Sequence, residues 1–168
     1  ATTEMGDLVQ PFLDRFKLKH FVRQYTIDEL SVLLSINAEK MRLNISDDAL
    51  STVARVSRGT PRIANNFLEW LRDYSIAHNI QGLQKHQATQ ALEMQGIDEN
   101  GLNPIDRKYI DVLKKLPKGS AIGVNTLCSA LSVDKQTIEQ KIEPYLIQQG
   151  YIGRTPKGRV LLDYEEIN

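Results

Sequence analysis

The sequence predicts a mainly α-helical chain with a small β-hairpin close to its end. Between residues 26 and 148, apolar side chains recur at helical spacing and polar capping residues mark the helix starts. After Gly150, two short β-prone runs flank the turn Pro156-Lys157-Gly158. Three helices followed by a two-stranded hairpin is the element order of a winged helix-turn-helix. Residues 103–168 are therefore expected to form a winged-helix domain.

Four helices are expected before this domain, over residues 26–95, the fourth and weakest running from about residue 84. Each of the first three starts at a side chain that can accept a hydrogen bond from the helix N-terminus. These caps are Thr26, which forms a capping-box pattern with Glu29, then Ser46, and then Thr60, which places Pro61 at the first helical position. Such a series of amphipathic helices predicts a small helical domain.

The chain opens on a stretch with no core of its own. It starts with Ala1-Thr2-Thr3, and the candidate strand His20–Tyr25 would need partner strands. We therefore expect this opening stretch to be the end of a larger domain.

The winged-helix part has its own caps and breaks. We expect a polar linker over residues 96–102, and helices that begin after Asn103, near Val124 and after Asp134. Pro144 lies inside the third helix and should bend it near Glu143. The expected strands are residues 151–155 and 159–164.

Charge and composition limit the classes of function. Residues 103–168 hold ten Lys/Arg and eight Asp/Glu, a net +2, whereas residues 1–102 hold eleven and thirteen, a net −2. Any contact with nucleic acid must therefore be local rather than a general electrostatic attraction. A single cysteine, Cys128, excludes an internal disulfide and suits a reducing, cytoplasmic protein. No apolar run reaches the ~18 residues of a membrane span, and the three histidines lack metal-ligand spacing.

Three short motifs carry a resemblance to a known family. They are Ala1-Thr2-Thr3 with Asp14-Arg15-Phe16, then Arg58-Gly59-Thr60-Pro61-Arg62-Ile63-Ala64-Asn65, and then the segment 143–159. In this order and spacing they resemble the C-terminal half of the RuvB family, the bacterial AAA+ ATPases of Holliday-junction branch migration. The resemblance implies the end of the large ATPase domain in residues 1–25, a helical lid in 26–95, a linker in 96–102 and a winged helix in 103–168.

The resemblance also implies cofactors and partners. A full-length member would use ATP and ADP with Mg²⁺, form a homo-hexamer, act on the duplex arms of a four-way junction and meet a junction-binding loader protein. This chain contains no G-x-x-x-x-G-K-[ST] phosphate loop. We therefore expect it neither to bind the nucleotide fully nor to hydrolyse ATP by itself, and we expect no membrane contact.

By the same resemblance, four residues face a nucleotide. Arg15 would be an arginine finger that reaches the nucleotide of a neighbouring subunit, where a rigid, permanently charged fork suits phosphoryl transfer. Arg62 would contact the phosphates, Tyr25 the base, and Thr3 would lie at the strand end that orients the attacking water. Without the resemblance, Arg15 is more simply a surface residue paired with Asp14. The departures from the family pattern are Glu4, Leu13 and Lys17.

Four cations of the winged helix are the candidate DNA contacts. Arg154, Lys157 and Arg159 surround the hairpin turn, and Lys135 follows the cap of the third helix. Long cations beside a turn suit phosphates rather than base edges, so binding without sequence preference is expected. A solvated, charged hairpin is the simpler alternative.

Two other functions fit part of the sequence. One is a stand-alone winged-helix protein that binds DNA or a partner without ATPase activity, and the other is the lid and winged helix of an initiator-type AAA+ protein. The segment 143–159 disfavours the second. A phosphate loop upstream in the parent gene would favour the motor, and a start codon near Ala1 the stand-alone protein.

Overall fold

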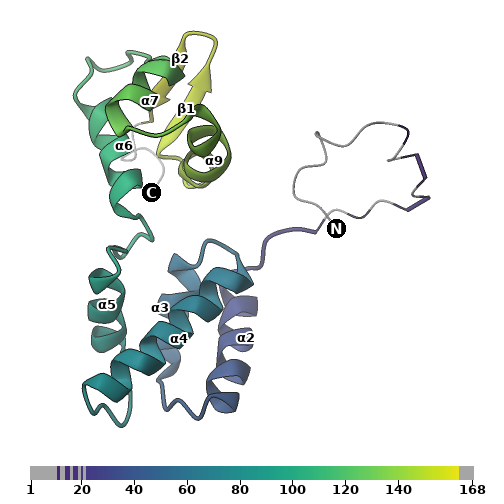
Figure 1. The fold of residues 1–168 in the computed structure, drawn as a ribbon, viewed down its shortest axis with the longest axis vertical. Helices are drawn as coiled ribbons and strands as arrows, with labels where there is room; N and C mark the ends of the chain where they lie inside the picture. Colours follow the sequence, from purple (N-terminus) through teal and green to yellow (C-terminus); the bar gives the residue numbers. More distant parts are fainter. Residues whose placement is uncertain (1–10, 12–13, 16, 19, 21, 163–168) are drawn as a thin grey trace.

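The computed structural model describes residues 11, 14–15, 17–18, 20 and 22–162, and it is mainly helical, as predicted. The described residues form two units, of which the first is purely helical and the second ends in a two-stranded hairpin (Figure 1). The first unit comprises α2 (Ile27–Lys40), α3 (Asp47–Val56), α4 (Pro61–Ala77) and α5 (Lys85–Met94). The second unit comprises α6 (Pro104–Lys114), α7 (Val124–Leu131), α8 (Lys135–Thr137), η2 (Ile138–Ile142), α9 (Glu143–Gln148), β1 (Ile152–Thr155) and β2 (Gly158–Leu161).

The helices of the first unit begin where the sequence predicts. Thr26 accepts from the Glu29 amide while the Glu29 carboxylate accepts from the Thr26 amide, so the capping box is confirmed. Ser46 caps α3 through the Ala49 amide, also as predicted. Thr60 is the N-cap residue of α4 and Pro61 its first residue, as predicted. The expected side-chain cap is wrong, because the Thr60 hydroxyl donates to the Arg58 carbonyl instead.

One hydrophobic core holds the four helices together. Its fully buried side chains come from all four helices and from the segment before α5, and include Leu30, Leu34, Val53, Leu68, Leu71, Leu83 and Ala88. Burial of a Leu or Val side chain contributes roughly 1.5–3 kcal/mol. The apolar side chains that recur at helical spacing in the sequence are the ones that form this core. Among the described residues, no helix has both the length and the apolar character needed to cross a membrane.

The strand expected at His20–Tyr25 is wrong for the residues that the structure describes there. Residues 20 and 22–25 have no regular secondary structure, and the Tyr25 amide donates instead to the Gly59 carbonyl at 3.1 Å. A strand is stable only beside a partner strand, and the pairing that Tyr25 finds is with a turn of the helical unit.

The second unit is a winged helix around its own core. The helices and β1 bury side chains that include Tyr109, Leu127, Ile138, Leu146 and Ile152. Asn103 caps α6 and Asp134 caps α8, as predicted. The hairpin pairs Ile152 with Leu161 and Thr155 with Gly158, and Ile122 adds an isolated bridge to Arg159.

The predicted third helix of this unit consists of α8, η2 and α9 in direct succession, and it continues past Pro144 without breaking. A π-helical segment, η2, precedes α9, and the Glu143 amide donates to the Ile138 carbonyl five residues earlier. Because proline has no amide hydrogen and clashes with the preceding turn, an α-helix cannot pass it undisturbed. The bend expected near Glu143 thus takes the form of a local change in helical register.

Candidate nucleic-acid and nucleotide surfaces

The hairpin formed by β1 and β2 is the wing of the winged helix, and its two arginines share one face. Arg154 and Arg159 are direct partners in the strand register, so their side chains lie on the same side of the sheet. Ile152, two residues before Arg154, is fully buried. Since side chains alternate along a strand, this face of the hairpin is the one directed at the third helix.

A buried carboxylate lies beneath both arginines. Glu143 is fully buried, with its Oε1 2.8 Å from Arg159 Nε and its Oε2 2.5 Å from Arg154 Nη2. The Tyr109 hydroxyl donates to the same carboxylate at 2.9 Å, and Glu139 pairs with Arg159 at 2.8 Å. We call these five residues the Glu143 cluster. No buried side-chain nitrogen or oxygen of the cluster lacks a hydrogen-bond partner, as buried charges require.

The Glu143 cluster carries no net positive charge. Burial opposes ionisation of Glu143, but the hydrogen bonds from Arg159, Arg154 and Tyr109 outweigh it and lower the pKa of the carboxyl. Burial, together with the charge of Glu143, raises the pKa of the Tyr109 hydroxyl, which stays neutral. The bond to Glu143 raises the pKa of Arg159. Two carboxylates thus balance two guanidiniums.

The four predicted DNA contacts therefore differ in how they present charge. The Arg159 side chain is only 13% exposed and its guanidinium is engaged inside the protein, whereas Arg154 is 48% exposed. Lys157, at the hairpin tip, and Lys135, in the first turn after Asp134, are both exposed. This placement gives Arg159 a role in holding the wing, and leaves its contact with DNA a prediction.

The sequence reasoning missed Glu143 as a functional residue. One signal was available: because Ile152 belongs to the core, the alternation of a strand also turns Arg154 toward the protein. An arginine on a core-facing side needs an acidic partner. The spacing of residues within the strand does not show which acidic residue is that partner.

Tyr25 and the turn ahead of Arg62 lie at the same end of the first unit. The Tyr25 amide binds the Gly59 carbonyl, and Gly59 adopts a left-handed φ of 67°. A methyl group on Gly59 would lie 2.8 Å from Gln24 Cβ, so only glycine lets the two segments approach this closely. The Tyr25 side chain is 43% exposed and Arg62 is exposed in the first turn of α4. Neither is a core residue.

Of the other two residues predicted to face a nucleotide, the structure describes Arg15 but not Thr3. Arg15 lies in an exposed turn, and no hydrogen bond or ion pair joins it to the described residues of the first unit. Lys17 is also exposed. Thr3, Glu4 and Leu13 lie outside the described residues.

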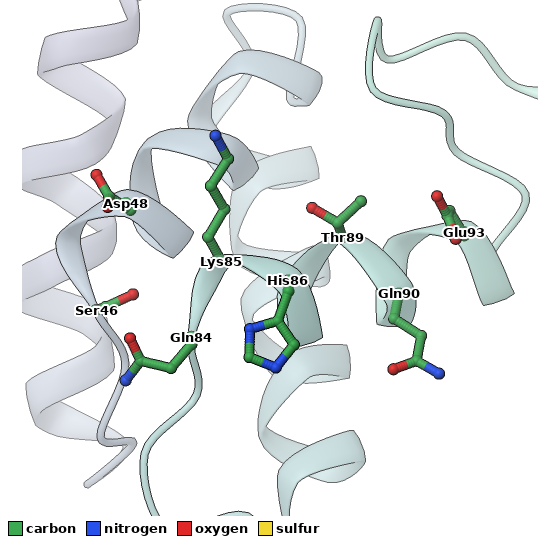
Figure 2. Close-up of a pocket in the computed structure, with 8 residues that line it drawn as sticks. All are labelled: Ser46, Asp48, Gln84, Lys85, His86, Thr89, Gln90 and Glu93. Carbon is green, nitrogen blue, oxygen red and sulfur yellow. The ribbon is translucent and has the colours of Figure 1, made fainter.

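A separate polar hollow of about 620 Å³ lies on the first unit (Figure 2). A parallel bridge between Ile45 and Leu83 places the starts of α3 and α5 side by side there. Its lining is of mixed charge and includes none of the predicted site residues: Ser46, Asp48, Gln84, Lys85, His86, Thr89, Gln90 and Glu93. Across the described part of the chain, no three His, Cys, Asp or Glu side chains gather as metal ligands.

Comparisons with known proteins agree over most of the chain. A family model of the RuvB AAA lid domain matches residues 25–98, and one of the RuvB C-terminal winged helix domain matches residues 99–163. The chain is 40% identical over 159 residues to the Holliday junction branch migration complex subunit RuvB of Trichormus variabilis and to that of a Nostoc species. Each match covers 95% of this chain but only 43% of the relative.

A solved structure is similar as well. The Thermotoga maritima RuvB Holliday junction branch migration motor superposes with a TM-score of 0.84 at 32% identity. The match covers 96% of this chain and 54% of that one. The arrangement of the helical unit and the winged helix is thus found in a protein about twice as long.

Proposed function

Because the chain belongs to the RuvB family, we propose that it is the lid and winged-helix part of an ATP-dependent motor that drives Holliday-junction branch migration. The two family models, which together match residues 25–163, support this proposal. The observation that carries it is the wing, where the cluster fixes two arginines while Lys157 remains exposed at the tip. From here the first unit is called the lid.

The winged helix would hold the DNA backbone without reading bases. Lys157 and Lys135 are exposed cations on the wing and at the start of the third helix, and Arg154 has half of its side chain in solvent. Contacts of this kind position a protein on a duplex but carry no sequence information. A motor that moves along any sequence needs such contacts. Arg159 and Glu143 would act indirectly, by keeping the wing against the third helix.

The lid would face the nucleotide through Arg62 and Tyr25. In the full-length protein, ATP with Mg²⁺ supplies the phosphoryl group that is transferred to water. Arg62 fits a phosphate contact because it is an exposed cation at a helix N-terminus, where anions are favoured and a cation without an anionic partner is not. The half-exposed Tyr25 fits a base contact, and Thr3 would lie near the attacking water.

The remaining roles need further subunits and partners. Arg15 would complete the site of a neighbouring subunit in a homo-hexamer, for which its exposed turn is suitable. The duplex arms of a four-way junction would be the substrate, brought by a junction-binding loader protein of the same complex.

The proposal is tested by binding of the chain to labelled DNA. Fluorescence anisotropy would compare a four-way junction, two duplexes of unrelated sequence and a single strand as the salt concentration is raised. We expect weak binding that is equal for the two duplexes and falls steeply with salt. A clear preference for one duplex sequence, or no binding to any of these DNAs at low salt, would refute the DNA-motor function.

A further inference from the structure

The lid and the winged helix meet at the side chain of Arg58. This residue lies in the turn between α3 and α4, with a left-handed φ of 53°. Its guanidinium reaches into the second unit, where Nη2 lies 2.6 Å from the Gly101 carbonyl and 2.5 Å from the Asp106 carboxylate. The guanidinium carbon lies 4.0 Å from the centre of the Tyr145 ring. Arg58 thus contacts the linker, α6 and α9 at once.

The winged helix provides a preformed binding site for this guanidinium. Asp106 is fully buried, and its Oδ2 accepts from Arg58 and from the Asn103 amide. Its Oδ1 finds no hydrogen-bond partner among the described residues. A buried carboxylate without a countercharge is strongly unfavourable. Asp106 therefore depends on a cation that the lid supplies.

The linker is closely packed at this junction rather than a free tether. Gly101 adopts a φ of 73°, and a methyl group there would lie 2.9 Å from the Tyr145 hydroxyl and 3.1 Å from Val56 Cα. The Tyr145 hydroxyl donates to the Asn100 carbonyl at 2.8 Å. The Asp98 carboxylate accepts from two amides of the linker. The backbone of the linker is thus held between the end of α3 and the side chain of α9.

The same turn lies beside Tyr25 and Arg62, the two lid residues proposed above to contact the nucleotide. The carbonyl of Gly59, next to Arg58, accepts from the Tyr25 amide, and Arg62 lies in the first turn of α4, three residues after Gly59. The turn is therefore bonded to Tyr25 through Gly59, and it is bonded to the winged helix and the linker through Arg58.

We propose that Arg58 is a positioning residue, which fixes the orientation of the winged helix relative to the turn that precedes Arg62. Through its bonds to Asp106 and Gly101 and its contact with Tyr145, the lid and the winged helix move as one body. A displacement of the turn is then transmitted to the wing. This rigid connection between the lid and the winged helix, called the joint below, does not depend on the proposed function. The transmission of the nucleotide state from the lid to the wing through this joint does rest on the proposed function.

Nuclear magnetic resonance relaxation of ¹⁵N-labelled chain tests the joint. The variants are Arg58→Ala and the double variant Arg58→Met/Asp106→Asn, which removes both charges and keeps Asp106 from being buried unpaired. Arg55→Ala, at an exposed arginine of α3, three residues before Arg58, is the matched control. We expect one common tumbling time for α2–α5 and α6–α9 in the unchanged chain and in the control. Both Arg58 variants should give two different, shorter times with the amide shifts of each core preserved.

A second measurement tests the transmission in the full-length protein. The double variant should keep its basal ATP turnover but lose the change in turnover that DNA causes in the unchanged protein. A common tumbling time in the double variant would overturn the joint, and retained DNA stimulation would overturn the transmission. Separate tumbling in a chain that fails to bind any DNA would support the joint while refuting the proposed function.

Discussion

Arg159 on β2 and Glu143 at the start of α9 form an ion pair, with 2.8 Å between Arg159 Nε and Glu143 Oε1. The Glu143 side chain is fully buried and the Arg159 side chain is 13% exposed. Arg154 binds the same carboxylate from the opposite strand. Two like charges directly opposite in a hairpin would repel each other, so Glu143 is what allows both arginines to occupy one face. Glu143 thus ties both strands of the wing to the third helix, beside the Glu139–Arg159 pair and the buried Ile152.

Glu143→Gln should destabilise the winged helix by about 3 kcal/mol, because it leaves the largely buried Arg159 without its main countercharge. Glu139 still pairs with Arg159, and Arg154 can turn into water, so the loss should not exceed this figure greatly. Urea unfolding of the chain measures the change. Glu93→Gln, at an exposed position of α5, is the control and should have almost no effect. Equal stability of the two variants would show that the ion pair does not hold the wing.

Gly158→Ala should also destabilise the wing. Gly158 has a φ of 136°, and an added methyl group would lie 2.3 Å from the Ile122 carbonyl oxygen, a backbone atom that cannot move aside. We expect a cost at or above the roughly 1–3 kcal/mol of a strained backbone conformation. Thermal unfolding would measure it. At Gly123, a methyl group meets nothing within 4 Å, so Gly123→Ala serves as the control and should change the unfolding temperature much less.

The capping box of α2 gives a prediction for pH. The hydrogen bond from Arg23, together with the Thr26 amide, lowers the pKa of Glu29 from 4.5 to about 2. Because the folded value is lower than the unfolded one, the stabilisation is fully present above pH 4.5 and is lost as the pH falls through the folded value. The carboxyl carbon of Glu29 should therefore titrate near 2 by NMR. In Arg23→Ala the midpoint should move toward 4.5, and an unchanged midpoint would contradict the role of Arg23.

Helix starts and cores could be predicted from the sequence because both depend on local pattern. The boxes and caps at Thr26, Ser46 and Asp134 act within three residues, and apolar spacing alone marks which face is buried. The wing and its turn were predicted for the same reason.

The ion pairs could not be predicted in this way. Glu143 meets Arg159 from 16 residues away, and Arg58 meets Asp106 from 48 residues away, so neither pair lies within a local pattern. The three wing cations therefore looked equivalent in the sequence, although one is held inside the protein. The strand expected at His20–Tyr25 is wrong because its residues are β-prone but find no strand to pair with among the described residues.

Arg15→Ala in the full-length protein should abolish ATP turnover while nucleotide binding persists. An arginine finger acts on the charge that develops during phosphoryl transfer, and fingers of this type supply roughly 10³–10⁵ in rate. Turnover and nucleotide affinity would be measured on the same preparation. If the affinity fell as much as the turnover, Arg15 would be a binding residue of its own subunit rather than a finger for its neighbour.

The salt dependence of junction binding by this chain tests most directly whether exposed wing cations grip DNA phosphates. The affinity for a four-way junction would be measured over a series of salt concentrations for the unchanged chain, for Lys157→Ala and for Lys85→Ala, which removes an exposed lysine from the lid. Loss of one phosphate contact should lower the slope of log affinity against log salt by about 0.9 in magnitude for Lys157→Ala. The slope for Lys85→Ala should equal that of the unchanged chain. Identical slopes for all three proteins would contradict the proposed interface.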